Sequence, residues 1–298
     1  MELLRALETI RSPFFDLLIG LITRLGEETI IMVAICAVYW CINKRVAYGI
    51  GIAFFFSGLT VQGMKICFRI ERPWVADPTL NPVPMAMEQA TGYSFPSGHT
   101  QSAASFFGSL GAALKQKPLK ITCIVIIALV GFSRLYLGVH RLIDVIVSIL
   151  ISLALVAFTV LFFKNDKVDR KKEFILSLVM SLYSITVIII AAVLYSGGVL
   201  EQGYVSDCLK AAGAGIGFAV GMYVERVHID FSVSCKSCFM QILKLVIGLI
   251  GIIIIKEGLK VVAGTGLVID SVRYFLMPIW LTVAYPQIIK RFFVTISS

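Results

Sequence analysis

The stretch Tyr93 to Ser102, YSFPSGHTQS, decides how the rest of the chain is interpreted. Its Pro-Ser-Gly turn delivers His99, and an apolar run follows as far as Leu114. This pattern predicts a helix that begins at the turn and carries His99 in its first turn. The N–H groups at a helix start are unpaired and partly positive, so Ser97, Gly98 and His99 are predicted to form a cradle for phosphate or a similar anion.

The composition indicates an integral membrane protein. Of the 298 residues, 58% are hydrophobic and only 15% are charged, and the mean hydropathy is +0.90. A soluble chain of this length is far less apolar. The net charge of +9 is spread over many short loops and forms no basic stripe with aromatic residues, so we expect the lipid bilayer, and no nucleic acid, as a partner. The oligomeric state cannot be read from the sequence.

Hydropathy predicts an all-α fold, a polytopic bundle of about nine membrane-spanning helices. The predicted spans are 28–42, 46–68, 99–114, 119–138, 142–163, 174–195, 208–224, 239–255 and 267–289. Before them, the apolar second half of residues 1–27 offers only roughly twelve residues of helix, which is too short to cross the bilayer, so this segment is predicted to lie along its interface. A short helix packed on the bundle is the alternative. Glycines at 213, 217 and 221 predict a smooth helix face for close packing.

Lysine and arginine predict the topology, because cytoplasmic loops hold the excess of these residues. With the amino terminus outside, the inside loops contain about half of them, most densely between Lys164 and Lys172. This arrangement places the Tyr93 to Ser102 stretch at the outer face. It also places there two further polar stretches, Lys65 to Pro73 (KICFRIERP) and Ser133 to Asp144 (SRLYLGVHRLID).

These two stretches supply what the anion cradle lacks. A phosphoryl group in transfer needs cations, a nucleophile and an acid. Lys65 and Arg72 are seven residues apart, two turns if one helix continues that far, and Arg134 adds a planar fork for phosphate oxygens.

His140 and Asp144 are four residues apart at a predicted helix start, so the carboxylate can fix the tautomer of the imidazole. An activated histidine nucleophile requires this pairing. His99 is then left as the general acid. Taken singly, each residue is more often a snorkelling arginine or a surface histidine. The chain has only three histidines, however, and two of them fall in the three polar stretches named above.

The three stretches resemble the signature of the PAP2 superfamily, the type 2 phosphatidic acid phosphatases, written Lys-x6-Arg-Pro, Pro-Ser-Gly-His and Ser-Arg-x5-His-x3-Asp. The span count resembles the glucose-6-phosphatase and sphingosine-1-phosphate phosphatase branches. The resemblance implies a metal-independent enzyme without a cofactor. It also implies phosphate binding by Lys65, Arg72, Ser97, Gly98 and Arg134, acid catalysis by His99, a phosphohistidine at His140, and orientation of His140 by Asp144.

The predicted organisation is an interfacial segment at 1–27, a PAP2-type catalytic core at 28–163, and additional transmembrane helices of unknown role at 164–298. The predicted activity is hydrolysis of a lipid phosphomonoester, or of an isoprenyl or lipid diphosphate, at the non-cytoplasmic side of the plasma membrane. A non-catalytic transporter or lipid-binding scaffold on the same fold is the alternative. The apolar, proline-rich connection at 72–95 is predicted to cover the site, unless it simply packs on the helix ends.

Overall fold

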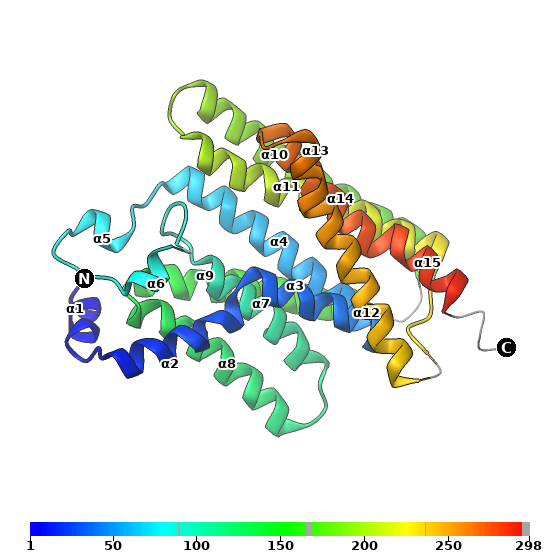
Figure 1. Cartoon of the computed structure of the whole chain (residues 1–298), viewed down its shortest axis with the longest axis horizontal. Coiled ribbons are helices and arrows are strands. Elements are labelled where there is room, and N and C mark those ends of the chain that lie inside the picture. Colours follow the sequence, from blue (N-terminus) through cyan, green and yellow to red (C-terminus); the bar gives the residue numbers. More distant parts are fainter. Residues whose placement is uncertain (89, 165–167, 236, 294–298) are drawn as a thin grey trace. The chain divides into compact units, whose positions relative to one another are not determined.

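The computed structural model describes residues 1–88, 90–164, 168–235 and 237–293. Every regular element in these ranges is a helix (Figure 1), which confirms the predicted all-α fold. Of the basic residues used to predict the topology, Lys167 and Lys236 lie outside the described residues. The chain divides into two compact units, Met1–Met32 with Thr60–Leu161, and Val33–Leu59 with Phe162–Ser298. All predicted site residues belong to the first unit.

The first unit is built from short amino-terminal helices, two short helices in the connection 72–95 between the first two of the three motif stretches, and three longer helices. In chain order they are α1 (Glu2–Thr9), α2 (Pro13–Thr23), the 3-10 turn η1 (Arg24–Gly26), the start of α3 (Glu28–Ala37), the end of α4 (Lys44–Phe68), α5 (Pro73–Ala76), α6 (Pro84–Met87), α7 (Gly98–Ala113), α8 (Lys117–Tyr136) and α9 (Leu142–Phe162). Ser12 caps α2 and Ser97 caps α7, each through its hydroxyl.

The amino-terminal helices and the connection between α4 and α7 pack on α8 and α9. One cluster of buried side chains joins Leu4 and Leu7 to Leu80, Leu135 and Val145. A second cluster contains Val83, Ala86, Tyr136, Leu137 and Val139. Burial of these side chains stabilises the connection, because each buried aliphatic side chain contributes about 1.5–3 kcal/mol relative to an exposed one. The connection is therefore part of the packed unit.

The second unit contains the remaining helices. They are the end of α3, η2 (Val38–Ile42), the start of α4, α10 (Arg170–Ser196), α11 (Gln202–Val224), η3 (Glu225–Ile229), α12 (Cys238–Ile253), η4 (Ile254–Gly258), α13 (Leu259–Ala263), α14 (Leu267–Ile279), η5 (Trp280–Ala284) and α15 (Tyr285–Phe292). The predicted glycine face on α11 packs against α14. A Cβ atom at Gly213 would lie 2.4 Å from the carbonyl oxygen of Ser271, and one at Gly217 would lie 2.3 Å from that of Phe275. Close helix packing is thus confirmed.

The predicted count of nine spans is not confirmed. By length and composition, six helical segments among the described residues can cross a membrane, or up to seven if the bent pair Pro13–Gly26 and Glu28–Ile42 forms one span. The two other predicted spans correspond to α7, which has 16 residues, and to α11. Helix α11 is long enough, but its glycines and the charged Asp207 and Lys210 dilute its hydropathy.

Candidate active site

Arg72 is placed by a break in the backbone after α4. This helix ends at Phe68 because Arg69 adopts a left-handed conformation, with φ 50°. Lys65 and Arg72 therefore do not share one continuous helix, and Arg72 lies instead immediately before Pro73, the first residue of α5. Lys65 is 9% exposed in the last turn of α4.

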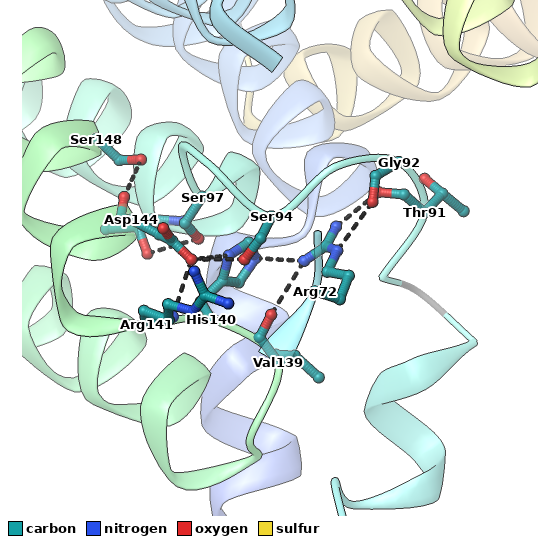
Figure 2. A network of polar contacts seen from close by, with 11 residues as sticks. Arg72, Thr91, Gly92, Ser94, Ser97, Val139, His140, Arg141, Asp144 and Ser148 are labelled. Carbon is teal, nitrogen blue, oxygen red and sulfur yellow. Dashed lines mark hydrogen bonds and ion pairs between the residues drawn. The ribbon is translucent and has the colours of Figure 1, made fainter. Parts of the chain in front are cut away.

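The buried guanidinium of Arg72 joins the connection between motifs to the loop before α9 (Figure 2). Its Nε donates to the carbonyl oxygen of Gly92 at 2.9 Å, and its Nη2 donates to that of Thr91 at 2.6 Å. Its Nη1 donates to the carbonyl oxygen of Val139 at 3.2 Å and lies 2.8 Å from Nε2 of His140. Arg72 thus contacts one of the two predicted catalytic histidines directly.

His140 lies in the connection before α9 rather than in the helix, whose first turn carries Asp144. Its imidazole is 2% exposed, and its Nδ1 lies 3.4 Å from Oδ2 of Asp144. Arginine can only donate, so Nε2 of His140 must be the acceptor of the Arg72 contact and Nδ1 must carry the proton. This tautomer leaves the lone pair on Nε2, the nitrogen that faces the cations.

Burial lowers the pKa of His140 well below its ordinary value, and the positive charges of Arg72, Arg134 and Lys65 lower this pKa further. The imidazole is therefore neutral at pH 7, which is the state that a nucleophile requires. Lys65 and Arg134 thus act on His140 through their charge.

The carboxylate of Asp144 is fully buried and held by several donors. Its Oδ2 accepts from the hydroxyl of Ser94 at 2.6 Å and from the backbone N–H of Arg141 at 2.8 Å, as Figure 2 shows. Its Oδ1 is buried and has no hydrogen-bond partner among the described residues. The carbonyl oxygen of Asp144 accepts from the backbone N–H of Ser97 at 3.2 Å. Asp144 thereby ties the start of α9 to the start of α7.

The helix start at Ser97 to His99 retains two backbone donors. The N–H of Ser97 is used by Asp144, whereas the N–H groups of Gly98 and His99 have no partner in the part of the chain that the structure describes. A Cβ atom at Gly98 would meet nothing within 4 Å, so there is open space beside this residue. Nε2 of His99 is buried and also without a partner among the described residues.

Arg134 lies in the last turn of α8 and is 1% exposed. Its Nη1 donates to Oγ1 of Thr23 at 2.8 Å, and its Nε is buried without a partner among the described residues. The structure thus brings together Arg72, His140 and Asp144 by direct contact, and Ser97 through the Asp144 backbone.

Two polar residues of the site were not predicted. Ser94 falls in the stretch that predicted the anion cradle, but nothing there indicates that its hydroxyl meets a carboxylate 50 residues later. Thr23 is 111 residues from Arg134 and carries no local signal. Within the described residues, no group of three histidine, cysteine, aspartate or glutamate side chains could hold a metal ion.

Within the described residues, the chain is all-helical and brings together a buried histidine, carboxylate and arginine. Residues 45–168 match the PAP2 superfamily, and residues 209–296 match the transmembrane extension of PAP2 superfamily phosphatases. The two matches cover more than half of the chain, so it belongs to the PAP2 superfamily. The predictions of a PAP2-type phosphatase and of an integral membrane protein are confirmed. The match to residues 209–296 also gives most of the carboxyl-terminal helices a family.

Two known proteins are similar to this chain. Phosphatidylglycerophosphatase B from Bacillus subtilis (strain 168) is 26% identical over 187 residues, which is 57% of this chain and 84% of the relative. The crystal structure of Aquifex aeolicus LpxE is 24% identical with a TM-score of 0.48, covering 53% of this chain and 93% of that chain. The resemblance to the glucose-6-phosphatase and sphingosine-1-phosphate phosphatase branches stays a prediction, because the span count behind it is not confirmed.

Proposed function

We propose that this chain removes phosphate from a membrane lipid, either a phosphomonoester or a diphosphate, through a phosphohistidine at His140. One observation carries the proposal. Nε2 of His140 lies 2.8 Å from Arg72, while Nδ1 faces Asp144. A neutral imidazole with its lone pair on the side of the cations has the form that attack on phosphorus requires.

In the first step, the lone pair of Nε2 of His140 forms a bond to phosphorus, and the bond from phosphorus to the leaving oxygen breaks. Arg72 transfers its hydrogen bond from Nε2 to a phosphoryl oxygen as the substrate enters. The electron pair of the broken bond stays on the leaving oxygen, which takes a proton from Nε2 of His99. This nitrogen has no other partner among the described residues, and the proposed step requires it to carry a proton when the substrate enters.

In the second step, water attacks phosphorus and gives a proton to His99. The nitrogen–phosphorus bond breaks, its electron pair returns to Nε2 of His140, and inorganic phosphate leaves. Asp144 holds the Nδ1 proton of His140 and stabilises the imidazole while it carries the phosphoryl group.

The charge that develops on the phosphoryl oxygens is stabilised by Lys65, Arg72 and Arg134 and by the N–H groups of Gly98 and His99. The open space beside Gly98 supports the placement of the phosphoryl group there. Three cations and a helix start can serve the role of a metal ion, so the reaction is proposed to need neither a metal nor a cofactor.

The substrate is proposed to be a lipid phosphate that reaches the site from the outer leaflet of the plasma membrane. Phosphatidylglycerol phosphate is one candidate, since a relative bears the name phosphatidylglycerophosphatase B. Phosphatidate, an isoprenyl diphosphate and a sphingoid phosphate also present a terminal phosphate at the interface.

The test is release of inorganic phosphate from these four lipids by the purified chain in detergent with excess chelator. Acid-quenched enzyme given labelled substrate should hold an acid-labile phosphoryl group. His140→Ala should lose both the turnover and the label and keep its fold, because the nucleophile is missing. His228→Ala changes the remaining histidine, which lies in the second unit, and should keep both.

Substantial turnover by His140→Ala would contradict the phosphohistidine route. Release that stops in chelator and returns with magnesium would contradict the metal-independent mechanism. If the wild-type chain released no phosphate from any of the four lipids, the alternative of a scaffold or transporter on this fold would be favoured.

A further inference from the structure

We propose that the amino-terminal segment 11–26 completes the active site, with Thr23 as a positioning residue for Arg134. The inference rests on the proposed function, because it assigns Arg134 to a phosphoryl oxygen. The segment precedes residues 45–168, which match the PAP2 superfamily, so the family match gives it no role. It nevertheless belongs to the same compact unit as the site residues.

The first observation is the contact between Thr23 and Arg134. Thr23 is the last residue of α2 and is 4% exposed, and its Oγ1 accepts from Nη1 of Arg134 at 2.8 Å. The guanidinium is planar, so one fixed nitrogen restricts the direction of the other donors. Nε of Arg134 is buried without a partner among the described residues. Thr23 therefore helps to determine which donors Arg134 presents to an anion.

The second observation is the close approach of Gly26 to His99. A Cβ atom at Gly26 would lie 2.6 Å from the carbonyl oxygen of His99 and 2.7 Å from Cγ1 of Val130, so only glycine fits here without a shift. Val130 belongs to α8, one turn before Arg134. Within four residues, the segment thus contacts both the start of α7 and the end of α8.

The third observation is a pair of polar contacts that hold α2 along α8. Nε of Arg11 donates to the carbonyl oxygen of Tyr136 at 2.8 Å, and the hydroxyl of Tyr136 donates to Oδ1 of Asp16 at 2.9 Å. Arg11 also donates to the carbonyl oxygen of Asn81 in the connection between motifs. These hydrogen bonds hold the segment against the end of α8 and thereby keep Thr23 beside Arg134.

The experiment measures the dissociation constant of vanadate from its protection of the detergent-solubilised full chain against thermal unfolding. Vanadate copies the phosphoryl transition state, and its binding needs no turnover. Thr23→Val keeps the shape but removes the hydroxyl, and it should weaken vanadate binding about tenfold, the effect of one hydrogen bond to a charged group. Thr23→Ser keeps the hydroxyl and should restore the wild-type affinity.

Thr159→Val is the matched control. Thr159 is 2% exposed in α9, and its hydroxyl donates within its own helix to the carbonyl oxygen of Val156 at 2.9 Å. This variant should keep the wild-type vanadate affinity, and Thr23→Val should melt at a similar temperature to it. In an Arg134→Ala background, Thr23→Val should weaken vanadate no further, because the residue it positions is gone.

Wild-type vanadate affinity in Thr23→Val would overturn the inference. So would a double variant whose loss of vanadate affinity equals the combined losses of Thr23→Val and Arg134→Ala. Because vanadate binding does not depend on a phosphohistidine, these results remain interpretable if His140→Ala proves active. Failure of the proposed mechanism and failure of this inference are thus separate outcomes.

Discussion

At the scale of single residues, several hydrogen bonds of the candidate site converge on Asp144. Its Oδ2 accepts from Ser94 at 2.6 Å and from the N–H of Arg141 at 2.8 Å, and both are shorter than its 3.4 Å contact with His140. The carboxylate is thus held in place independently of the histidine that it faces. Under the proposed mechanism, these two donors would hold Asp144 in the orientation in which it orients the imidazole of His140.

We predict that Ser94→Ala lowers kcat about tenfold, because a charge-assisted hydrogen bond to the buried carboxylate is lost. KM and the melting temperature should change little. Ser109→Ala is the matched control, since Ser109 is also buried in the first unit but its hydroxyl has no partner among the described residues. Steady-state kinetics of the two variants would contradict the orienting role of Ser94 if they were equal.

The lowered pKa of His140 predicts the acid limb of the pH profile. Burial and then Arg72 disfavour the protonated imidazole, so kcat/KM should fall only at a pH below the ordinary histidine value of about 6.5. Arg72→Gln removes one positive charge and should move the limb to higher pH. Ionisation of the substrate affects the wild-type and Arg72→Gln profiles equally, so a difference between the two profiles comes from the enzyme. If the acid limb does not move, the charge of Arg72 does not set the pKa of His140.

The residue types proposed for the site could be chosen from the sequence, because phosphoryl transfer would demand them and three spaced motifs supply them. The contacts of Ser94 and Thr23 were not, because both depend on which helix ends meet in three dimensions. The same limit applies to the break after α4. Nothing in the sequence indicates that Arg69, a non-glycine residue, takes a positive φ and ends the helix before Arg72.

At the scale of elements, the described part of the connection 72–95 has more regular structure than its four prolines suggested. Its described part contains α5 and α6, and the N–H of Val83 donates to the carbonyl oxygen of Leu137 at 3.0 Å. Thr91, Gly92 and Ser94 contact Arg72 or Asp144. The carboxyl-terminal end of the connection therefore lies on the site, while Met85 and Met87 remain 39% exposed.

We predict that Met85→Ala with Met87→Ala raises KM for a long-chain lipid phosphate and leaves KM for a short, soluble phosphomonoester unchanged. Only a long tail would reach these thioethers. Leu119→Ala is the control, because Leu119 is similarly exposed at the other end of α8. Equal effects on both substrates would return the connection to a purely structural role.

At the scale of the whole molecule, the all-α class follows from hydropathy, but the number of spans does not. Helices α7 and α11 are a short helix and a glycine-rich helix, for which length and apolarity are weak criteria. The predicted orientation in the membrane depends on the charge bias, to which the basic sequence stretch 164–172 contributes most.

Two native cysteines can test this orientation. Cys67 is exposed at the end of α4, beside the first motif, and Cys238 is exposed at the start of α12. With the site outside, an impermeant thiol reagent should label Cys67 in intact cells and Cys238 only after permeabilisation. Cys67→Ser and Cys238→Ser identify each signal, and labelling in detergent establishes that both thiols react. The reverse pattern would invert the topology.

The glycine face of α11 also determines which glycine-to-alanine substitutions a second substitution elsewhere in the chain can compensate. At Gly213 and Gly217, an added methyl group would strike carbonyl oxygens of α14, which every amino acid retains. No single replacement on α14 can make room for it. At Gly221 the obstacle is the side chain of Thr282, whose Oγ1 would lie 1.9 Å from the new Cβ atom. Replacing Thr282 with alanine removes that oxygen and leaves the Cβ atom of residue 282 at 3.1 Å, so only at the third glycine can a side-chain substitution relieve most of the clash.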